Sequence, residues 1–268
     1  MRDSMIDPRE LMDITLRVAG QTAGLLRDYS ELEGLEEIVG KQPLGDTTRK
    51  IDVIAEEYLI ELIRNEGLNS LVVTEERGII RVGSGDPEYV FIVDPLDGSS
   101  NYLSKIPWSA VSVAVAPCVK KNLRFNDIIA GTVAPIQSDL LPVSFAKGYG
   151  VFRASSRIRH VKTSVKDIVL GYFDYGRGTR ILDKLLRSWE NVKIRSLGCA
   201  SMEIVYVALG YADVFIDVRG WLRNVDVATA IGIAKETGAI VVDTSGNTIN
   251  APIINVVKIG ELIVSQNK

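Results

Sequence analysis

Two carboxylates stand three residues apart in the stretch Val-Phe-Ile-Val-Asp-Pro-Leu-Asp-Gly-Ser-Ser-Asn, which covers residues 90–101. Closely spaced carboxylates repel each other unless a positive charge lies between them, and a divalent cation is the simplest such charge. Asp94 and Asp97 are followed by Gly98 and Ser99, whose backbone amides could face a phosphate group. The stretch therefore favours a site that binds magnesium and a phosphate together.

Two other interpretations compete with this one. The first is a strand-to-helix turn in which the Asp and Ser side chains serve only as caps. The second is a calcium loop of the EF-hand type, which needs Gly at its sixth position and Glu at its twelfth. Counted from Asp94, those positions hold Ser99 and Lys105, so this calcium loop is excluded.

Further acids stand where elements are predicted to begin or end. An apolar run at residues 90–93 predicts a buried strand that ends at Asp94, because a proline follows and stops further pairing. Residues 71–73 predict another strand, which ends shortly before Glu75. Asp52 lies in the first turn of a predicted helix, where the helix dipole favours a carboxylate even without a catalytic role.

The predicted elements divide the α/β chain into two halves. In the first half the pattern predicts helices at 8–30 and 51–63, strands at 109–116 and 127–136, and a hairpin at 141–153. In the second half it predicts strand 167–173, helix 178–189, strand 192–196, helix 200–210, strand 213–217, helix 225–237 and strand 239–243. We therefore expect an α+β subdomain at 1–142 with the metal site, and an α/β subdomain at 143–268 with substrate-recognition elements.

Length and composition limit the classes of function. The chain has 268 residues, 46% hydrophobic and 24% charged, and a net charge of −3, which argues against general nucleic-acid binding. No apolar run is long enough to span a membrane, and the first residues lack the apolar core of a secretory signal. Cys118 and Cys199 make no disulfide framework, which predicts a reducing cytoplasm. The single histidine, His160, lies among basic residues, so we expect carboxylates and water to perform the acid–base chemistry.

The acids and their spacing resemble those of the lithium-sensitive, magnesium-dependent phosphomonoesterases, which include inositol monophosphatases and fructose-1,6-bisphosphatases. Residues 91–101 match the first signature of that family, W/F-I-x-D-P-[IL]-D-G-[ST]-x-N. Thr-Glu-Glu at 74–76 resembles the G-E-E segment, and residues 46–52 resemble the D-x-x-T-x-x-D segment. Residues 225–229 resemble the second signature, W-D-x-A-[AG], in a weakened form that reads Val-Asp-Val-Ala-Thr and has Val in place of Trp. The run at 217–226 is closest to the archaeal-type enzymes with both activities, and the resemblance implies a layered αβαβα sugar-phosphatase fold.

The resemblance also implies a metal site and a mechanism. The implied metal ligands are the carboxylates of Glu75, Asp94, Asp97 and Asp226 and the carbonyl of Leu96. They would hold two or three Mg²⁺ ions, with Mn²⁺ as a possible substitute and Li⁺ as a possible inhibitor. Asp52, Glu75 and Ser99 are the implied catalytic residues, and Ser99 and Asp52 would orient and deprotonate the attacking water. No side chain would become phosphorylated.

Substrate recognition is expected from the signature turn and from the second half. The predicted substrate-binding residues are Asp97, Gly98, Ser99, Arg195, Cys199, Asp217 and Arg219. Residues 195–200 resemble an R-x-x-G-[ST]-A loop in which Cys199 replaces the hydroxyl residue. Asp217 could accept hydrogen bonds from sugar hydroxyls, and Arg195 and Arg219 could bind a second phosphate. For each arginine a surface ion pair remains the alternative.

These expectations describe a Mg²⁺-dependent phosphatase for fructose 1,6-bisphosphate, inositol monophosphate or both. It would be a homodimer that acts on a small phosphorylated sugar or polyol, with no nucleic-acid or membrane partner. One alternative is a 3′(2′),5′-bisphosphate nucleotidase of the same superfamily. Another is a non-catalytic protein that binds a polyol phosphate or a metal, although the complete set of acids argues against it.

Overall fold

The computed structural model describes residues 6–41, 47–137, 139–158, 167–172, 180, 183–184, 187 and 191–266. The predicted helix at 178–189 lies for the most part outside these residues, and His160 lies outside them. Among the described residues, no helix is long and apolar enough to cross a membrane. Cys118 and Cys199 form no disulfide.

The two long helices of the first half form where they were predicted. Helix α1 (Pro8–Tyr29) begins after Asp7, whose carboxylate accepts a hydrogen bond from the backbone N–H of Arg9 at 2.8 Å. Helix α2 (Lys50–Asn65) follows a two-stranded hairpin of β1 (Ile38–Lys41) and β2 (Thr47–Arg49). Both helices bury one apolar stripe, which is the pattern that predicted them.

An eight-stranded sheet forms the centre of the first half, in the order β10-β9-β8-β7-β6-β5-β3-β4. Its strands are β3 (Ser70–Thr74), β4 (Gly78–Val82), β5 (Tyr89–Asp97), β6 (Ala110–Pro117), β7 (Ala130–Pro135), β8 (Val143–Ala146), β9 (Gly150–Arg153) and β10 (Ser156–Ile158). The neighbours β3 and β5 run parallel, and the other neighbours run antiparallel. All nine residues of β5 are buried, so this strand is covered on both faces.

A second sheet of five strands follows, in the order β12-β11-β13-β15-β14. Its strands are β11 (Ile168–Gly171), β12 (Lys193–Arg195), β13 (Val214–Asp217), β14 (Ile240–Val242) and β15 (Leu262–Ser265). The remaining helices are α3 (Ser99–Leu103), the short 3-10 helix η1 (Phe125–Asp127), α5 (Ala200–Leu209) and α6 (Asn224–Glu236). The predicted alternation of strands and helices in the second half is therefore found wherever the structure describes it.

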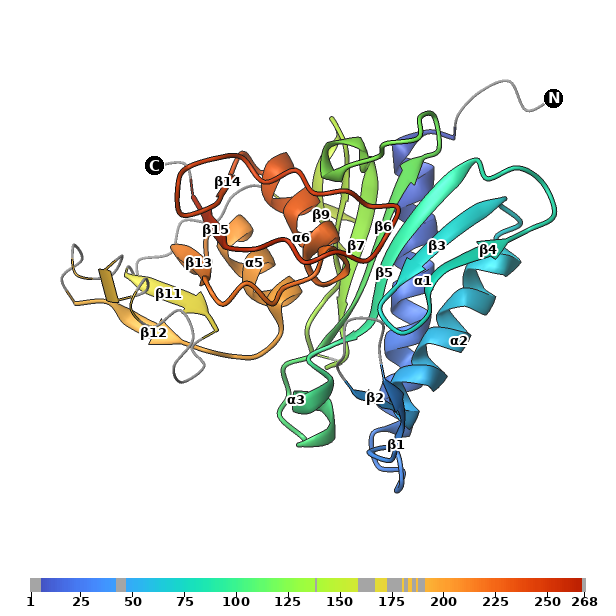
Figure 1. Ribbon diagram of the computed structural model, residues 1–268, viewed down its shortest axis with the longest axis horizontal. Coiled ribbons are helices and arrows are strands. Elements are labelled where there is room, and N and C mark those ends of the chain that lie inside the picture. The colour runs from blue at the N-terminus through green and yellow to red at the C-terminus, as the bar shows by residue number, and fades with distance from the viewer. Residues whose placement is uncertain are drawn as a thin grey trace.

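The elements form layers, as Figure 1 shows. Helices α1 and α2 cover one face of the eight-stranded sheet, while α5 and α6 lie on the other face, between the two sheets. One cluster of buried side chains lies beneath α1 and α2, and another joins the eight-stranded sheet to α5 and α6. The predicted layered α/β fold is confirmed.

The hairpin predicted as the border between subdomains belongs to the first sheet. Strands β8 and β9 form this hairpin, and β8 is hydrogen-bonded to β7 along Val143 to Ala146. Their pairing extends the eight-stranded sheet to β10, so the change from one sheet to the other comes after Ile158 and not at residue 142. The division into subdomains at residue 142 stays a prediction, but the hairpin does not mark the end of the first sheet.

Candidate active site

Strand β5 carries two predicted site carboxylates on either side of a bulge. Asp94 pairs with Ser112 of β6 and Asp97 pairs with Ala110, so β5 has one residue more than β6 between these positions. Side chains alternate between the faces of a strand, and the extra residue turns both carboxylates into one cavity. The prediction that the strand ends at Asp94 is therefore wrong. Pro95, which has no N–H to donate, falls inside the bulge.

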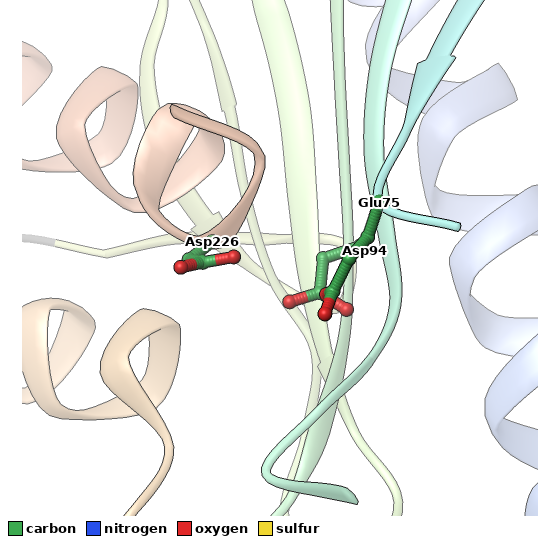
Figure 2. Close-up of side chains that lie close together, drawn as sticks. All are labelled: Glu75, Asp94 and Asp226. Atoms are coloured by element: carbon green, nitrogen blue, oxygen red, sulfur yellow. The ribbon is translucent and has the colours of Figure 1, made fainter. Parts of the chain in front are cut away.

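Glu75, Asp94 and Asp226 each bring a carboxylate oxygen within 4.8 Å of the other two. Figure 2 shows the three side chains pointing toward one another from different elements. Glu75 directly follows β3, the parallel neighbour of β5, and Asp226 lies in the first turn of α6. The structure thus brings together three of the predicted metal ligands, from segments far apart in the sequence.

This carboxylate cluster (Glu75, Asp94 and Asp226) carries more negative charge than its surroundings balance. Burial raises the pKa of Asp94 well above its usual value, and three neighbouring carboxylates raise it further. Burial also raises the pKa of Asp226 to about 6, and Arg223 opposes that rise. A divalent cation would remove the repulsion, and carboxylate oxygens are ligands that Mg²⁺ prefers. The donor set therefore fits a metal ion.

Asp97 differs from the cluster because the protein already saturates one of its oxygens. Its Oδ2 accepts hydrogen bonds from the Sγ of Cys199 at 3.0 Å, from the N–H of Ser201 at 2.7 Å and from the Oγ of Ser201 at 2.6 Å. These donors belong to the start of α5 and fix the orientation of the carboxylate. Oδ1 is the oxygen that Asp97 can offer to a metal or a substrate.

Three predicted substrate-binding residues, Arg195, Cys199 and Asp217, do not line the cavity beside the acids. The thiol of Cys199 is fully buried and donates a hydrogen bond to the carboxylate of Asp97. Arg195 ends β12 with an exposed side chain, and its guanidinium donates to the carbonyl of Ile194 at 2.7 Å. The R-x-x-G-[ST]-A pattern located the loop, but it did not reveal which side of the loop each side chain faces.

The signature turn is packed against the loop that precedes α5. Gly98 has a φ of 82°, and a Cβ atom there would lie 3.0 Å from the carbonyl oxygen of Gly198. The left-handed conformation and this close approach both require glycine. Nδ2 of Asn101 donates to the carbonyls of Trp108 at 2.7 Å and Leu197 at 2.6 Å. The turn whose amides are predicted to face a phosphate is therefore held from two sides.

Glu203, which the sequence analysis did not single out, holds the same loop from within α5. Its Oε1 accepts hydrogen bonds from the N–H groups of Leu197 at 3.1 Å and Gly198 at 2.8 Å. The side chain is fully buried, and burial raises the pKa of Glu203 to about 7, although these amides oppose the rise. The only feature of the sequence that could have indicated Glu203 is its position as an acid in the first turn of a predicted helix.

A cavity of about 200 Å³ opens beside the carboxylate cluster. The predicted site residues that line it are Glu75, Asp94, Leu96, Asp97, Gly98, Ser99, Arg219 and Asp226. A smaller cavity of about 20 Å³ adjoins Glu75, Asp94 and Ser99 and is also lined by Asp52. Burial raises the pKa of Asp52, while the backbone N–H and the charge of Arg49 oppose the rise. A larger cavity of about 540 Å³ between α5 and β7 has mainly apolar walls and none of the predicted site residues.

Arg219 follows the end of β13 and lines the cavity of about 200 Å³ beside the carboxylate cluster. Its backbone N–H donates to Asp217 at 2.8 Å, and its Nη2 lies 2.6 Å from the same carboxylate. The guanidinium carbon also lies 4.0 Å from the centre of the Tyr172 ring. Asp217 is fully buried, does not line the cavity, and has its carboxylate paired with Arg219.

The sequence analysis did not single out Arg223, although its side chain contacts two acids of the carboxylate cluster. Its Nη2 lies 2.6 Å from a carboxylate oxygen of Glu75, and its Nε lies 3.3 Å from Oδ1 of Asp226. Its backbone N–H donates to Oδ2 of Asp226 at 2.8 Å, which caps α6. The same Arg-x-x-Asp spacing caps α2, at Arg49 and Asp52, so the spacing alone does not separate a cap from a site.

Comparison with known proteins gives a consistent result. Residues 7–267 match the model of the inositol monophosphatase family. The chain is 36% identical over 266 residues to an inositol-1-monophosphatase of Aeropyrum pernix, which covers 97% of this chain and 94% of that protein. It is 32% identical over 259 residues to a fructose-1,6-bisphosphatase/inositol-1-monophosphatase of Methanothermobacter thermautotrophicus, covering 95% and 91% of the two chains.

A solved structure supports the same assignment. The crystal structure of an inositol monophosphatase–fructose 1,6-bisphosphatase superposes with a TM-score of 0.78 at 27% identity, covering 95% of this chain and 94% of that one. The family recognised from the signature motifs, the layered fold and the class of enzyme are thus confirmed. The chain belongs to the inositol monophosphatase family of phosphoric monoester hydrolases.

Proposed function

We propose that the chain is a Mg²⁺-dependent phosphatase that hydrolyses fructose 1,6-bisphosphate and inositol monophosphate by direct attack of water. The observation that carries the proposal is the convergence of Glu75, Asp94 and Asp226 beside the turn at Gly98 and Ser99. The carboxylates can hold cations, and the turn presents backbone amides to an anion. Together they suit a phosphate ester bound next to a metal.

The metal ligands in this proposal are the carboxylates of Glu75, Asp94, Asp97 and Asp226 and the carbonyl of Leu96. Bound Mg²⁺ supplies positive charge to the phosphate oxygens and the leaving alkoxide, and lowers the pKa of water. Asp97 contributes Oδ1, because Oδ2 is occupied by donors from α5. The number of ions, two or three, and the use of Mn²⁺ in their place belong to the same proposal.

Ser99 and Asp52 orient the attacking water and take its proton. Both line the small cavity, together with Glu75 and Asp94. Burial raises the pKa of Asp52 above its usual value, which makes its carboxylate a stronger base than an exposed aspartate. Ser99 lines both cavities, so its hydroxyl can contact groups in either one.

Arg219 recognises the part of the substrate farther from the reacting phosphate. Asp217 and Tyr172 hold its guanidinium at the cavity wall, so little side-chain freedom is lost when it binds an anion. This arrangement supports a second phosphate in the substrate and favours the bisphosphate over the monophosphate. Arg195, exposed on β12, has no part in this contact.

A homodimer completes the proposal, and it is supported by the family resemblance alone. Light scattering of the purified chain at several concentrations measures it directly. A mass of one chain at all concentrations would remove this part and leave the rest intact.

The test of the proposed activity is a substrate panel. Phosphate release is measured with fructose 1,6-bisphosphate, inositol 1-phosphate and a nucleoside 3′,5′-bisphosphate under identical conditions. We expect turnover of the first two, with the higher kcat/KM for the sugar bisphosphate. Preference for the nucleotide would overturn the substrate assignment, and no turnover of any phosphate ester would overturn the activity.

A further inference from the structure

We infer that the guanidinium of Arg223 is a built-in counter-ion of the carboxylate cluster, which a metal ion must displace from Glu75 and which then pairs with the substrate phosphate. This inference rests on the proposed metal dependence. It assigns to Arg223 two successive partners within one cavity. The consequence is that Arg223 weakens metal binding while it supports catalysis.

The contacts of Arg223 place its charge inside the cluster. Nη2 lies 2.6 Å from Oε1 of Glu75, and Nε lies 3.3 Å from Oδ1 of Asp226. Both acids contribute to the set of oxygens that lie within 4.8 Å of one another. The side chain of Arg223 is 14% exposed and that of Glu75 15%, so water screens their attraction only in part. A cation that binds these oxygens competes with the guanidinium for them.

The charges around the cavity single out Arg223 from the other arginine in its wall. Arg219 pairs with Asp217, a carboxylate that does not line the cavity. Arg223 instead pairs with Glu75 and Asp226, which do line it. A metal ion that takes over these oxygens leaves the Arg223 charge within the same cavity. The turn at Gly98 and Ser99 lines that cavity as well, so a phosphate bound there is within the reach of a long flexible side chain.

The backbone N–H and the side chain of Arg223 make different contacts, so the side chain can be substituted while the backbone contact is kept. The N–H of Arg223 caps α6 by donating to Oδ2 of Asp226 at 2.8 Å. Any residue other than proline at this position keeps that hydrogen bond. Arg223→Gln therefore removes the charge and leaves the cap. The matched control is Arg49→Gln, because Arg49 caps α2 through the same backbone contact to Asp52.

The experiment measures Mg²⁺ binding by calorimetry without substrate, at pH 8.5 so that protons do not compete for the carboxylates. We expect Arg223→Gln to bind Mg²⁺ about 10–100-fold more tightly than the wild type, as the loss of a competing charge-assisted contact predicts. Arg49→Gln should stay within about twofold of the wild type. The kcat/KM of Arg223→Gln should fall, and Arg223→Lys, which keeps the charge, should recover part of it.

The inference predicts that Arg223→Gln strengthens Mg²⁺ binding and lowers turnover. Damage to the fold would instead weaken both. Equal or weaker Mg²⁺ binding by Arg223→Gln would overturn the inference. If the wild type binds no Mg²⁺ at all, the proposed metal dependence fails first. If Arg223→Gln does not fold in EDTA, folding is repeated with Mg²⁺: recovery supports the counter-ion role, and failure to recover contradicts it.

Discussion

The acids of the active site fall into two groups that differ in how the protein satisfies their oxygens. On the side of α5 and β13, Asp97 accepts three hydrogen bonds, Asp217 is paired with a guanidinium, and Glu203 accepts two backbone amides. In the carboxylate cluster, by contrast, Asp94 accepts one hydrogen bond within its own strand, from the N–H of Leu96 at 3.0 Å. The first group holds other parts of the site in place. In the second group, three carboxylates repel one another and share one guanidinium, that of Arg223.

This difference separates acids whose oxygens are held by protein donors from acids that lie close to other carboxylates. Asp97 belongs to the first group through Oδ2, and its Oδ1 is the oxygen that we propose for the metal. A buried carboxylate with protein donors on its oxygens is a fixed acceptor, and its orientation is set before any ligand arrives. A buried carboxylate beside two others lowers its charge by taking up a proton or by binding a metal. Substitutions in the two groups should therefore have opposite effects on the stability of the metal-free chain.

The largest expected effect follows from Asp94→Asn. Turnover should fall by at least about 10³-fold, because a metal ligand and its charge are lost. In EDTA, however, the same variant should melt about 2–4 °C above the wild type, because the mutual repulsion of the cluster is reduced. Asp97→Asn should also lose turnover but melt below the wild type, since it weakens the bonds to α5. Equal shifts in melting temperature for both variants would break the comparison.

Ser99→Ala should lower kcat by about 10²–10⁴-fold and leave KM nearly unchanged, because the hydroxyl is proposed to act on water and not on the substrate. After a single turnover in H₂¹⁸O, the released phosphate should carry one solvent oxygen. A phosphorylated side chain trapped by rapid quench would contradict direct attack of water.

A smaller effect is expected on substrate choice. Arg219→Ala should raise KM for fructose 1,6-bisphosphate by about 10–100-fold, which corresponds to about 1.5–3 kcal/mol for one charge-assisted contact. KM for inositol monophosphate should change little. Arg195→Ala is the matched control, because Arg195 is exposed on β12 and does not line the cavity. Equal losses on both substrates would show that Arg219 supports the shared part of the site.

The smallest effect concerns the pH dependence of stability through Glu203. Its pKa in the folded chain is about 7, above its ordinary value of 4.5, so the folded chain binds this proton more tightly than the unfolded chain. The stability that this proton contributes is complete below about pH 4.5 and is lost as the pH rises through about 7. The free energy of unfolding of the wild type, relative to Glu203→Gln, should therefore fall by about 1–3 kcal/mol from pH 5 to pH 8. A difference that stays constant with pH would show that Glu203 is ionised throughout.

Much of the fold and the positions of the acids along its elements could be predicted from the sequence. The signature at 91–101 combines a buried strand with a glycine turn, and both form as predicted. The bulge at Pro95 was not predicted, because a proline after a strand usually ends the pairing. Strand β15 (Leu262–Ser265) was also missed, since its four residues have no length or alternation to distinguish them from a loop.

The roles of individual side chains could not be predicted with the same success. Cys199 and Asp217 stand in the expected segments, but one contacts Asp97 and the other Arg219, because burial and direction are set by packing between distant elements. Arg223 was missed for a related reason. Its spacing to Asp226 is that of a helix cap, and only the approach of Glu75 from β3 makes it part of the site.

The most direct test of the account is the metal dependence of turnover. The purified chain is treated with EDTA, dialysed into metal-free buffer, and assayed with fructose 1,6-bisphosphate while Mg²⁺ is added back. The account predicts no turnover without metal and a saturable recovery with Mg²⁺, accompanied by a higher melting temperature. Undiminished turnover in EDTA would contradict it, because the convergence of Glu75, Asp94 and Asp226 would then have no catalytic purpose.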